Sequence, residues 1–337
     1  MHPLPVDVPE DLLAGLRVVA LPLVTRFRGT TLREAALIEG PCGWGEFAPF
    51  PEYDDDEAAT WLASAVEAAW RPSVEVVRET VPVNATVPAV APEDVPAVLA
   101  RFPGCRTAKV KVADAGTTLA DDVARVHAVR AALGPEGRIR IDANGAWNLD
   151  EAEHALRALS PYDLEYAEQP CARLDELAEL RRRCADLAIP IAADESVRRA
   201  TDPLAVARAG AADLLVMKAA PLGGVRAALA LAEQSGLPVV VSSALDTSVG
   251  LAAGVRLAAA LPELPYDCGL GTAALLAGDV TDHPLAPEDG AVPVRDAAPA
   301  SALLDRWRAD ADRTAWWRDR VTRCARLLRE DAAATGA

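Results

Sequence analysis

Lysine is the cationic residue that this sequence almost lacks. The 337 residues include three lysines against thirty-one arginines. Arginine stays protonated at any pH that a protein meets, whereas a lysine buried in a dry pocket can lose its proton and act as a base. We therefore treat the three lysines as candidate proton-transfer residues: Lys109, Lys111 and Lys218.

Positive charge, long apolar runs and paired cysteines are also scarce. Basic residues number 34 and acidic residues 50, a net charge of −16, so we expect neither a nucleic acid nor an anionic membrane as partner. No apolar run reaches the roughly 18 residues of a membrane span, and the acidic, proline-broken start is unlike a secretory signal. The six cysteines show no CxxC spacing, which predicts reduced thiols in a cytoplasmic protein.

Histidine offers no metal site. The sequence has four histidines, and none of them ends a predicted strand: His2, His127, His154 and His283. A structural or catalytic zinc ion would need several such ligands close together. We assign these side chains to the surface or to packing.

Short apolar runs alternate with helical patterns through the middle of the chain. Eight such runs are found, at about 81–87, 108–112, 138–144, 164–170, 189–196, 214–220, 238–245 and 266–272. Strands that alternate with helices are typical of βα units in a parallel sheet. The sequence therefore predicts an α/β fold, a modified TIM barrel of (β/α)₇β form, over residues 81–285.

The two ends of the chain predict a second domain. Residues 16–48 have the pattern of antiparallel strands, and residues 54–70 have an acidic first turn and an apolar period near 3.6, which indicates a helix. A helical tail with three tryptophans follows residue 286 and must pack against something. We predict an α+β capping domain over the barrel mouth, formed by residues 1–80 and 286–337.

One polar residue ends each of several successive predicted strands. Asp142, Glu168 and Asp194 are spaced by 26 residues, and Lys218 and Ser242 follow at intervals of 24. The carboxyl ends of the strands are where a barrel enzyme carries its active site. The sequence therefore predicts that these five side chains converge.

The predicted chemistry depends on charge. Lys109 and Lys111 lie two residues apart and point to one side of a strand, so their repulsion and burial should lower both pKa values. Three carboxylates without a counterion would repel, and oxygen ligands suit Mg²⁺, with Mn²⁺ as a substitute. The expected reaction is removal of a proton α to a carboxylate.

Each motif also has a plain structural explanation. Asp142–Gly145 could be a turn, Glu168–Pro170 a strand end, and Asp194–Ser196 a helix cap. Ser242 to Ala244 could cap a helix or bind a carboxylate, and Asp246 or Thr247 is the expected N-cap of the following helix. The even spacing, with lysines on both flanks, favours a functional site over these separate explanations.

The ordered motifs resemble the muconate-lactonizing subgroup of the enolase superfamily. They are Lys109-x-Lys111, Asp142-x-Asn144, Glu168-Gln-Pro, Asp194-Glu-Ser and Lys218, and the resemblance extends from residue 43 through the barrel. The resemblance implies a capped (β/α)₇β barrel with one Mg²⁺ on Asp142, Glu168 and Asp194. It also implies acid/base lysines on two faces of the substrate, a known pattern of that superfamily.

Within the subgroup, Arg140-x-Asp142 and the runs at 142–147 and 242–250 most resemble the o-succinylbenzoate synthase family. Its members dehydrate a small carboxylate, 2-succinyl-6-hydroxy-2,4-cyclohexadiene-1-carboxylate, to o-succinylbenzoate in menaquinone biosynthesis. The resemblance implies that Lys111 removes the α-proton and then helps the hydroxyl to leave, while Lys218 stabilises the enediolate. Supporting or substrate-binding roles fall to Lys109, Arg140, Asn144 and Ser242.

Other functions fit parts of the sequence. N-succinylamino acid racemisation would use the same two lysines as opposed bases, and muconate cycloisomerisation stays open. Dipeptide epimerisation is disfavoured because Tyr266–Gly269 lacks an Asp-x-Asp pair. A phosphate-binding barrel enzyme and a barrel used only as a binding protein are the alternatives from other classes. The oligomeric state is left open, with a monomer favoured.

Overall fold

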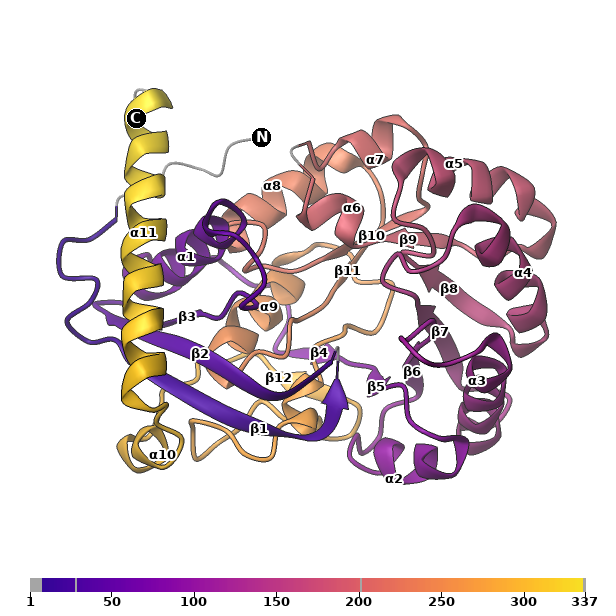
Figure 1. Cartoon of the computed structure of the whole chain (residues 1–337), viewed down its shortest axis with the longest axis horizontal. Helices are drawn as coiled ribbons and strands as arrows, with labels where there is room; N and C mark the ends of the chain where they lie inside the picture. The colour runs from indigo at the N-terminus through magenta and orange to yellow at the C-terminus, as the bar shows by residue number, and fades with distance from the viewer. Residues whose placement is uncertain (1–7, 28, 201, 336–337) are drawn as a thin grey trace.

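The computed structural model describes residues 8–27, 29–200 and 202–335. The predicted surface residue His2 and the first seven residues of the predicted cap lie outside this range. Figure 1 shows two parts: the N-terminal strands lie with the C-terminal helix on one side, and strands surrounded by helices form the other.

Seven parallel strands form the barrel sheet, in the spatial order β11-β10-β9-β8-β7-β6-β5. Their bounds are β5 (Ala85–Val87), β6 (Thr107–Lys111), β7 (Arg138–Asp142), β8 (Leu164–Glu168), β9 (Ile191–Ala193), β10 (Leu214–Met217) and β11 (Val239–Val241). Cys268 bridges Val83 at one end of this sheet, and Gly269 bridges Ser242 at the other. The segment at 268–269 therefore closes the barrel, and the predicted modified TIM barrel is confirmed.

Two of the predicted strands differ from the structure. The run at 81–87 is divided: β4 (Thr80–Pro82) pairs with β12 (Ala291–Pro293) outside the barrel, and only β5 joins the parallel sheet. The eighth run forms isolated bridges rather than a regular strand. The division follows Val83, whose amide donates to Gly290 while the next amide donates to Cys268, so the chain changes partners at this point.

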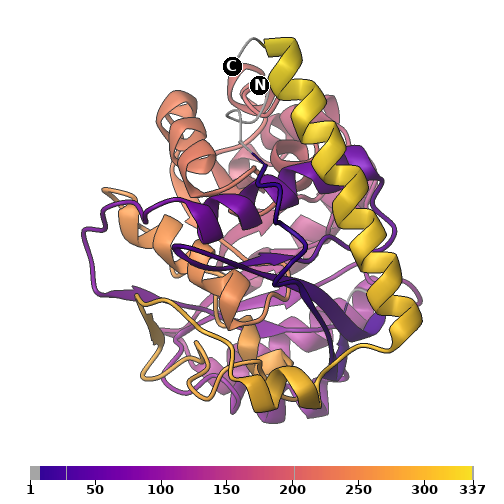
Figure 2. The same cartoon turned by 90° about the vertical axis from the view of Figure 1, so that its left-hand side faces the viewer.

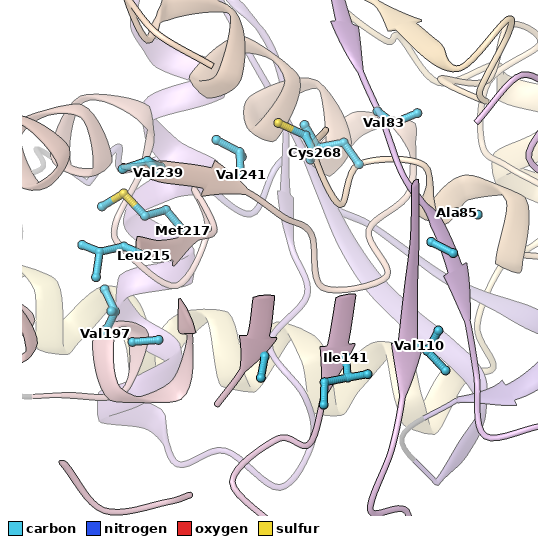
Figure 3. Packing of buried hydrophobic residues seen from close by; sticks show 14 of the residues in the cluster. Val83, Ala85, Val110, Ile141, Val197, Leu215, Met217, Val239, Val241 and Cys268 are labelled. Atoms are coloured by element: carbon cyan, nitrogen blue, oxygen red, sulfur yellow. The ribbon is translucent and has the colours of Figure 1, made fainter. Parts of the chain in front are cut away.

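Helices surround the barrel and bury its outer face. They are α2 (Val95–Leu99), α3 (Leu119–Leu133), α4 (Leu149–Leu159), α5 (Leu174–Arg183), α6 (Glu195–Arg198), α7 (Ala205–Arg208), α8 (Val225–Ser235) and α9 (Ser248–Ala260). Figure 3 shows apolar strand residues of this layer, among them Val110, Ile141 and Leu215. Because side chains alternate along a strand, the neighbours of Val110 and Ile141 point into the barrel.

The cap is an antiparallel sheet with helices, as predicted. Its elements are β1 (Arg17–Phe27), β2 (Thr30–Gly40), β3 (Gly43–Phe47), α1 (Asp55–Trp70), α10 (Ser301–Arg306) and α11 (Ala311–Thr335). The Asp54 carboxylate caps the start of α1. A Cβ on Gly45 would lie 2.0 Å from the carbonyl oxygen of Ala65, so glycine is needed for α1 to pack this closely on β3.

The tryptophans of the tail explain why α11 is ordered. Figure 2 shows α11 running along the cap. Trp317 is fully buried and meets the Phe47 ring edge-to-face at 5.7 Å between centroids. Arg320 is buried as well and donates to the backbone carbonyls of Phe50 and Tyr53. The predicted packing of the tail on the N-terminal elements is confirmed.

The remaining expectations about composition concern cysteine, histidine and membrane spans. All six cysteines are free. His127 lies on α3 with its ring centroid 6.0 Å from that of Tyr162, a packing role, and His154 lies on α4. Among residues 8–335, apart from 28 and 201, no helix is both long and apolar enough to cross a membrane.

A buried acid joins the cap to the barrel. Glu46, on β3, accepts hydrogen bonds from the amides of Thr247 and Gly250 at the start of α9, where Thr247 is the N-cap. The Asp246 carboxylate and the Arg33 guanidinium lie beside it. Burial, together with the charge of Asp246, raises the pKa of Glu46 from an ordinary value of 4.5 to about 8.

We predict that Glu46→Gln changes how stability depends on pH. The folded-state pKa of Glu46 lies above its ordinary value, so the folded protein binds this proton more tightly than the unfolded chain does. The resulting contribution to the free energy of unfolding is fully present below about pH 4.5 and is lost as the pH rises toward 8. The melting temperature of the wild type, measured relative to the variant, should therefore fall between pH 5 and pH 8. Glu39→Gln, on an exposed position of β2, is the control, and parallel curves for Glu46→Gln and the wild type would contradict the prediction.

Candidate active site

The barrel strands direct polar side chains into a small cavity beneath the cap. All three lysines line it, together with Asp142, Asn144 and Ser242, and Phe27 and Phe50 of the cap close it. Its volume is about 30 Å³. We therefore expect side chains around the cavity, among them Phe27 and Phe50, to move when a larger substrate binds.

Lys109 lies between two of the predicted metal ligands. Its Nζ is 2.6 Å from Oε1 of Glu168 and 2.8 Å from Oδ2 of Asp142, and the side chain is 8% exposed. Burial lowers the pKa of Lys109, but the two carboxylates outweigh burial and raise it overall. The expectation that both neighbouring lysines would have lowered pKa values is therefore wrong for Lys109.

Lys111 lies at the end of β6, nearer the cap. Its Nζ donates to Oδ2 of Asp142 at 2.5 Å and to Oδ1 of Asn144 at 2.6 Å, and it lies 5.4 Å from the centroid of the Phe27 ring. Burial lowers its pKa, and the Asp142 carboxylate opposes that shift only in part. The lowered pKa predicted from the sequence is confirmed for this lysine.

Lys218 lines the same cavity from the other side of the barrel. It follows β10, which is separated from β6 by three strands in the sheet. Its Nζ donates to Oδ2 of Asp194 at 2.5 Å, and burial lowers its pKa. Lys111 and Lys218 therefore face one space from two walls.

The lysines change the charge balance expected from the sequence. Each of the three carboxylates Asp142, Glu168 and Asp194 is paired with a lysine. The ammonium groups therefore serve as counterions, a role that the sequence predicted for a divalent cation. Within the described parts of the chain, no three His, Cys, Asp or Glu side chains form a group that could hold a metal ion as they stand.

The donor set nevertheless suits a divalent cation. Oε2 of Glu168 is buried and has no hydrogen-bond partner, which is costly for a carboxylate oxygen unless a cation or a polar group supplies one. Burial and the neighbouring Asp142 charge raise the pKa of Glu168 to about 8. A set made only of carboxylate oxygens is typical of Mg²⁺ and related hard cations.

Asn144, Ser242 and Arg140 differ in how close they lie to this cavity. Asn144 and Ser242 line it. Arg140 points into the barrel below it, where it is fully buried and donates to Glu165 at 2.9 Å, to the Tyr166 hydroxyl and to a backbone carbonyl. The structure therefore brings Asn144 and Ser242, but not Arg140, to the cavity surface.

Gln169 and Ser196 connect the strand ends that carry Glu168 and Asp194. The Gln169 side chain, after Glu168, accepts from the amides of Asp194 and Ser196 and donates to the Ser196 hydroxyl. It ties the end of β8 to the end of β9. The Gln169 backbone has a φ of 39°, a conformation that few side chains adopt and that this bonding holds in place.

Arg198, which was not predicted from the sequence, contacts the same centre. Its Nε donates to Oδ1 of Asp194 at 3.0 Å, and its side chain is 2% exposed. The available signal was its position four residues after Asp194, a spacing at which helical side chains meet. Tyr53, whose hydroxyl accepts from Arg198, lies in the cap segment between β3 and α1.

Comparisons with known proteins agree with this geometry. A family model described as "Enolase C-terminal domain-like" matches residues 96–299, and "Enolase N-terminal domain-like" matches residues 18–69. The o-succinylbenzoate synthase of Mycobacterium ulcerans is 57% identical over 97% of this chain and 98% of its own length. The o-succinylbenzoate synthase of Thermobifida fusca is 62% identical over 83% of this chain and 87% of its own.

Solved structures show the same fold at lower identity. A muconate lactonizing enzyme from Pseudomonas fluorescens, complexed with muconolactone, aligns with a TM-score of 0.73 and 22% identity over 87% of this chain and 98% of its own. An N-succinyl Arg/Lys racemase from Bacillus cereus aligns with a TM-score of 0.71 and 19% identity over 88% of this chain and 97% of its own. At these identities the likeness concerns the fold.

The fold and the matching family models define the class: the chain is a member of the enolase superfamily, whose members use a divalent metal. Within it, the identity to curated relatives over most of the chain shows that it belongs to the o-succinylbenzoate synthase family. It is accordingly an enzyme of the lyase class.

Proposed function

We propose that this enzyme dehydrates 2-succinyl-6-hydroxy-2,4-cyclohexadiene-1-carboxylate to o-succinylbenzoate, in menaquinone biosynthesis. The observation that carries the proposal is that Lys111 and Lys218 face one closed cavity from two walls, beside three buried carboxylates. The curated relatives bear the corresponding name. The six free thiols support a cytoplasmic location, and we propose a monomer as the working state.

Lys111 acts as the base in this proposal. Its Nζ takes the proton α to the substrate carboxylate, and the resulting ammonium then gives a proton to the departing hydroxyl, so that water leaves and the ring becomes aromatic. Lys111 can accept a proton only in its neutral form. Its ammonium must therefore first lose one of the protons that it donates to Asp142 and Asn144. Asn144 is well placed to orient the Nζ throughout.

Lys218 acts as a fixed cation. Its ammonium faces the cavity from the other wall and stabilises the negative charge that develops on the substrate carboxylate as the proton leaves. Lys109 keeps its proton, because its pKa is raised, and holds Asp142 and Glu168 together. Ser242 lines the cavity and serves to bind a polar group of the substrate.

Asp142, Glu168 and Asp194 would hold one Mg²⁺, for which Mn²⁺ could substitute. When bound, the cation supplies a Lewis acid for the substrate carboxylate oxygens. The unpartnered Oε2 of Glu168 supports this assignment. The pairing of each carboxylate with a lysine implies that these ion pairs rearrange when the cation enters.

The first experiment follows consumption of the cyclohexadiene substrate by ultraviolet absorbance, with Mg²⁺ and then with excess EDTA. We expect rapid turnover that EDTA abolishes and that added Mg²⁺ restores. Turnover that survives EDTA would contradict the metal assignment. An inert protein would contradict the synthase proposal, and deuterium uptake into N-succinyl amino acids would then test racemisation.

Racemisation is the second candidate, and the opposed lysines favour it. A racemase needs a base on each face of the substrate carbon, and Lys111 and Lys218 both have pKa values lowered by burial. The racemase from Bacillus cereus has the same fold. We place it second because curated relatives of 56–62% identity are named as o-succinylbenzoate synthases.

We predict that Lys111→Arg abolishes turnover while the protein stays folded. The guanidinium keeps the charge but cannot act as a base at neutral pH, so kcat should fall by about 10²-fold or more. Steady-state kinetics measures the loss, and an unchanged melting temperature shows that the fold is intact. A rate near that of the wild type would remove Lys111 from the mechanism.

We predict that Glu168→Gln weakens Mg²⁺ binding by at least about tenfold, since even neighbours of metal ligands commonly contribute that much. Calorimetric titration of the purified protein measures the affinity directly. Glu233→Gln, on an exposed position of α8, is the control for the same chemical change. Equal affinities in the wild type and Glu168→Gln would show that Glu168 is not a ligand.

A further inference from the structure

Arg198 links three parts of the active site through one guanidinium. Nε donates to Oδ1 of Asp194 at 3.0 Å, one Nη donates to Oε1 of Glu195 at 2.7 Å, and the other donates to the Tyr53 hydroxyl at 3.1 Å. The side chain is 2% exposed. A buried arginine of this kind has fixed geometry, because its donors form a planar fork.

The first branch reaches a predicted metal ligand. Asp194 is fully buried, and its two oxygens have different partners: Oδ2 accepts from Lys218 and Oδ1 from Arg198. Arg198 therefore fixes the rotation of the Asp194 carboxylate about the Cβ–Cγ bond. Since Oδ1 is held by Arg198, Oδ2, which contacts Lys218, would be the oxygen available to a cation.

The second branch reaches the proposed base. Oε1 of Glu195 also accepts from Nδ2 of Asn144 at 3.2 Å, and Oδ1 of Asn144 accepts from Nζ of Lys111. This bonding also fixes the orientation of the Asn144 amide, with its oxygen toward the lysine. Arg198 thus connects to Lys111 through two intermediate side chains.

The third branch reaches the cap. Tyr53 is 6% exposed and packs edge-to-face on Phe50, which closes the cavity, with ring centroids 5.5 Å apart. Arg320 of α11 donates to the backbone carbonyls of both residues, and the Arg199 guanidinium lies 5.1 Å from the Tyr53 ring centroid. The position of Tyr53 is therefore set by the closed cap.

We infer that Arg198 is a positioning residue, and that Tyr53 uses it to couple closure of the cap to the metal-binding carboxylate Asp194. The inference rests on the proposed function, in which Asp194 holds the cation. When the segment that carries Phe50 opens for substrate, Tyr53 leaves Arg198, and the Asp194 carboxylate loses part of its support. Metal affinity should therefore depend on a cap residue that does not touch the metal site.

The test is calorimetric titration of Mg²⁺ into the full-length protein and its variants, without substrate. Arg198→Met should weaken Mg²⁺ binding by about 10- to 100-fold, the usual effect of losing a neighbour of a metal ligand. Tyr53→Phe removes one hydroxyl and keeps the ring, and it should weaken binding by about threefold to tenfold. Tyr162→Phe, in the short 3-10 helix that follows α4, is the matched control and should bind as the wild type does.

A double-mutant cycle separates positioning from general damage. In a background of Arg198→Met, the further change Tyr53→Phe should have no effect on Mg²⁺ affinity, because Tyr53 acts through Arg198. Arg198→Lys keeps the positive charge but lacks the planar set of guanidinium donors. It should therefore not restore the Mg²⁺ affinity that Arg198→Met loses. Full rescue by lysine, or additive effects of the two changes, would overturn the inference.

The outcomes distinguish this inference from the proposal on which it rests. A wild type that binds no Mg²⁺ would overturn both. A wild type that binds Mg²⁺ and loses affinity in Glu168→Gln, while Tyr53→Phe and Arg198→Met bind normally, would overturn only the coupling. Melting temperatures of the metal-free variants show whether each is folded before it is titrated.

Discussion

Three buried carboxylates at one end of the barrel are the constraint on which the active site depends. Buried charges are stable only when they are paired. Here the partners are the three lysines of the chain, with Lys109 between Asp142 and Glu168. The same pairing keeps two lysines, Lys111 and Lys218, at the surface of the cavity, where burial lowers their pKa values. The site therefore pairs its buried charges and holds potential bases in place.

The cap completes the site because the barrel alone leaves its strand ends open. Phe27 and Phe50 close the cavity, and Glu46 fixes β3 to the start of α9. The C-terminal helix contributes from the other end of the chain, since Trp317 and Arg320 hold the segment that contains Phe50 and Tyr53. Residues far apart in the sequence thus decide how closely the cavity is closed.

A closed cavity and paired ions suit a reaction that removes a weakly acidic proton. Excluding water strengthens the effect of each fixed charge, and side chains that are already held need little reorganisation. The small volume of the cavity also leads us to expect that side chains around it move when substrate binds. If Arg198 couples the cap to Asp194, opening and closing would change the metal site as well as access to it.

The sequence by itself determined the parts that are set by short-range periodicity. The repeated runs predicted the barrel, and their polar last residues predicted that Asp142, Glu168, Asp194, Lys218 and Ser242 converge, because strand ends of parallel units must meet at one edge. In the structure Asp142, Lys218 and Ser242 line the cavity, and Glu168 and Asp194 contact its lysines. Only the tertiary structure decided which charges pair. It placed Lys109 between two carboxylates, Arg140 below the cavity, and Arg198 between Asp194 and Tyr53. Apart from the contact between Asp194 and Arg198, four residues apart, these contacts depend on distances between separate elements, which no local pattern in the chain records.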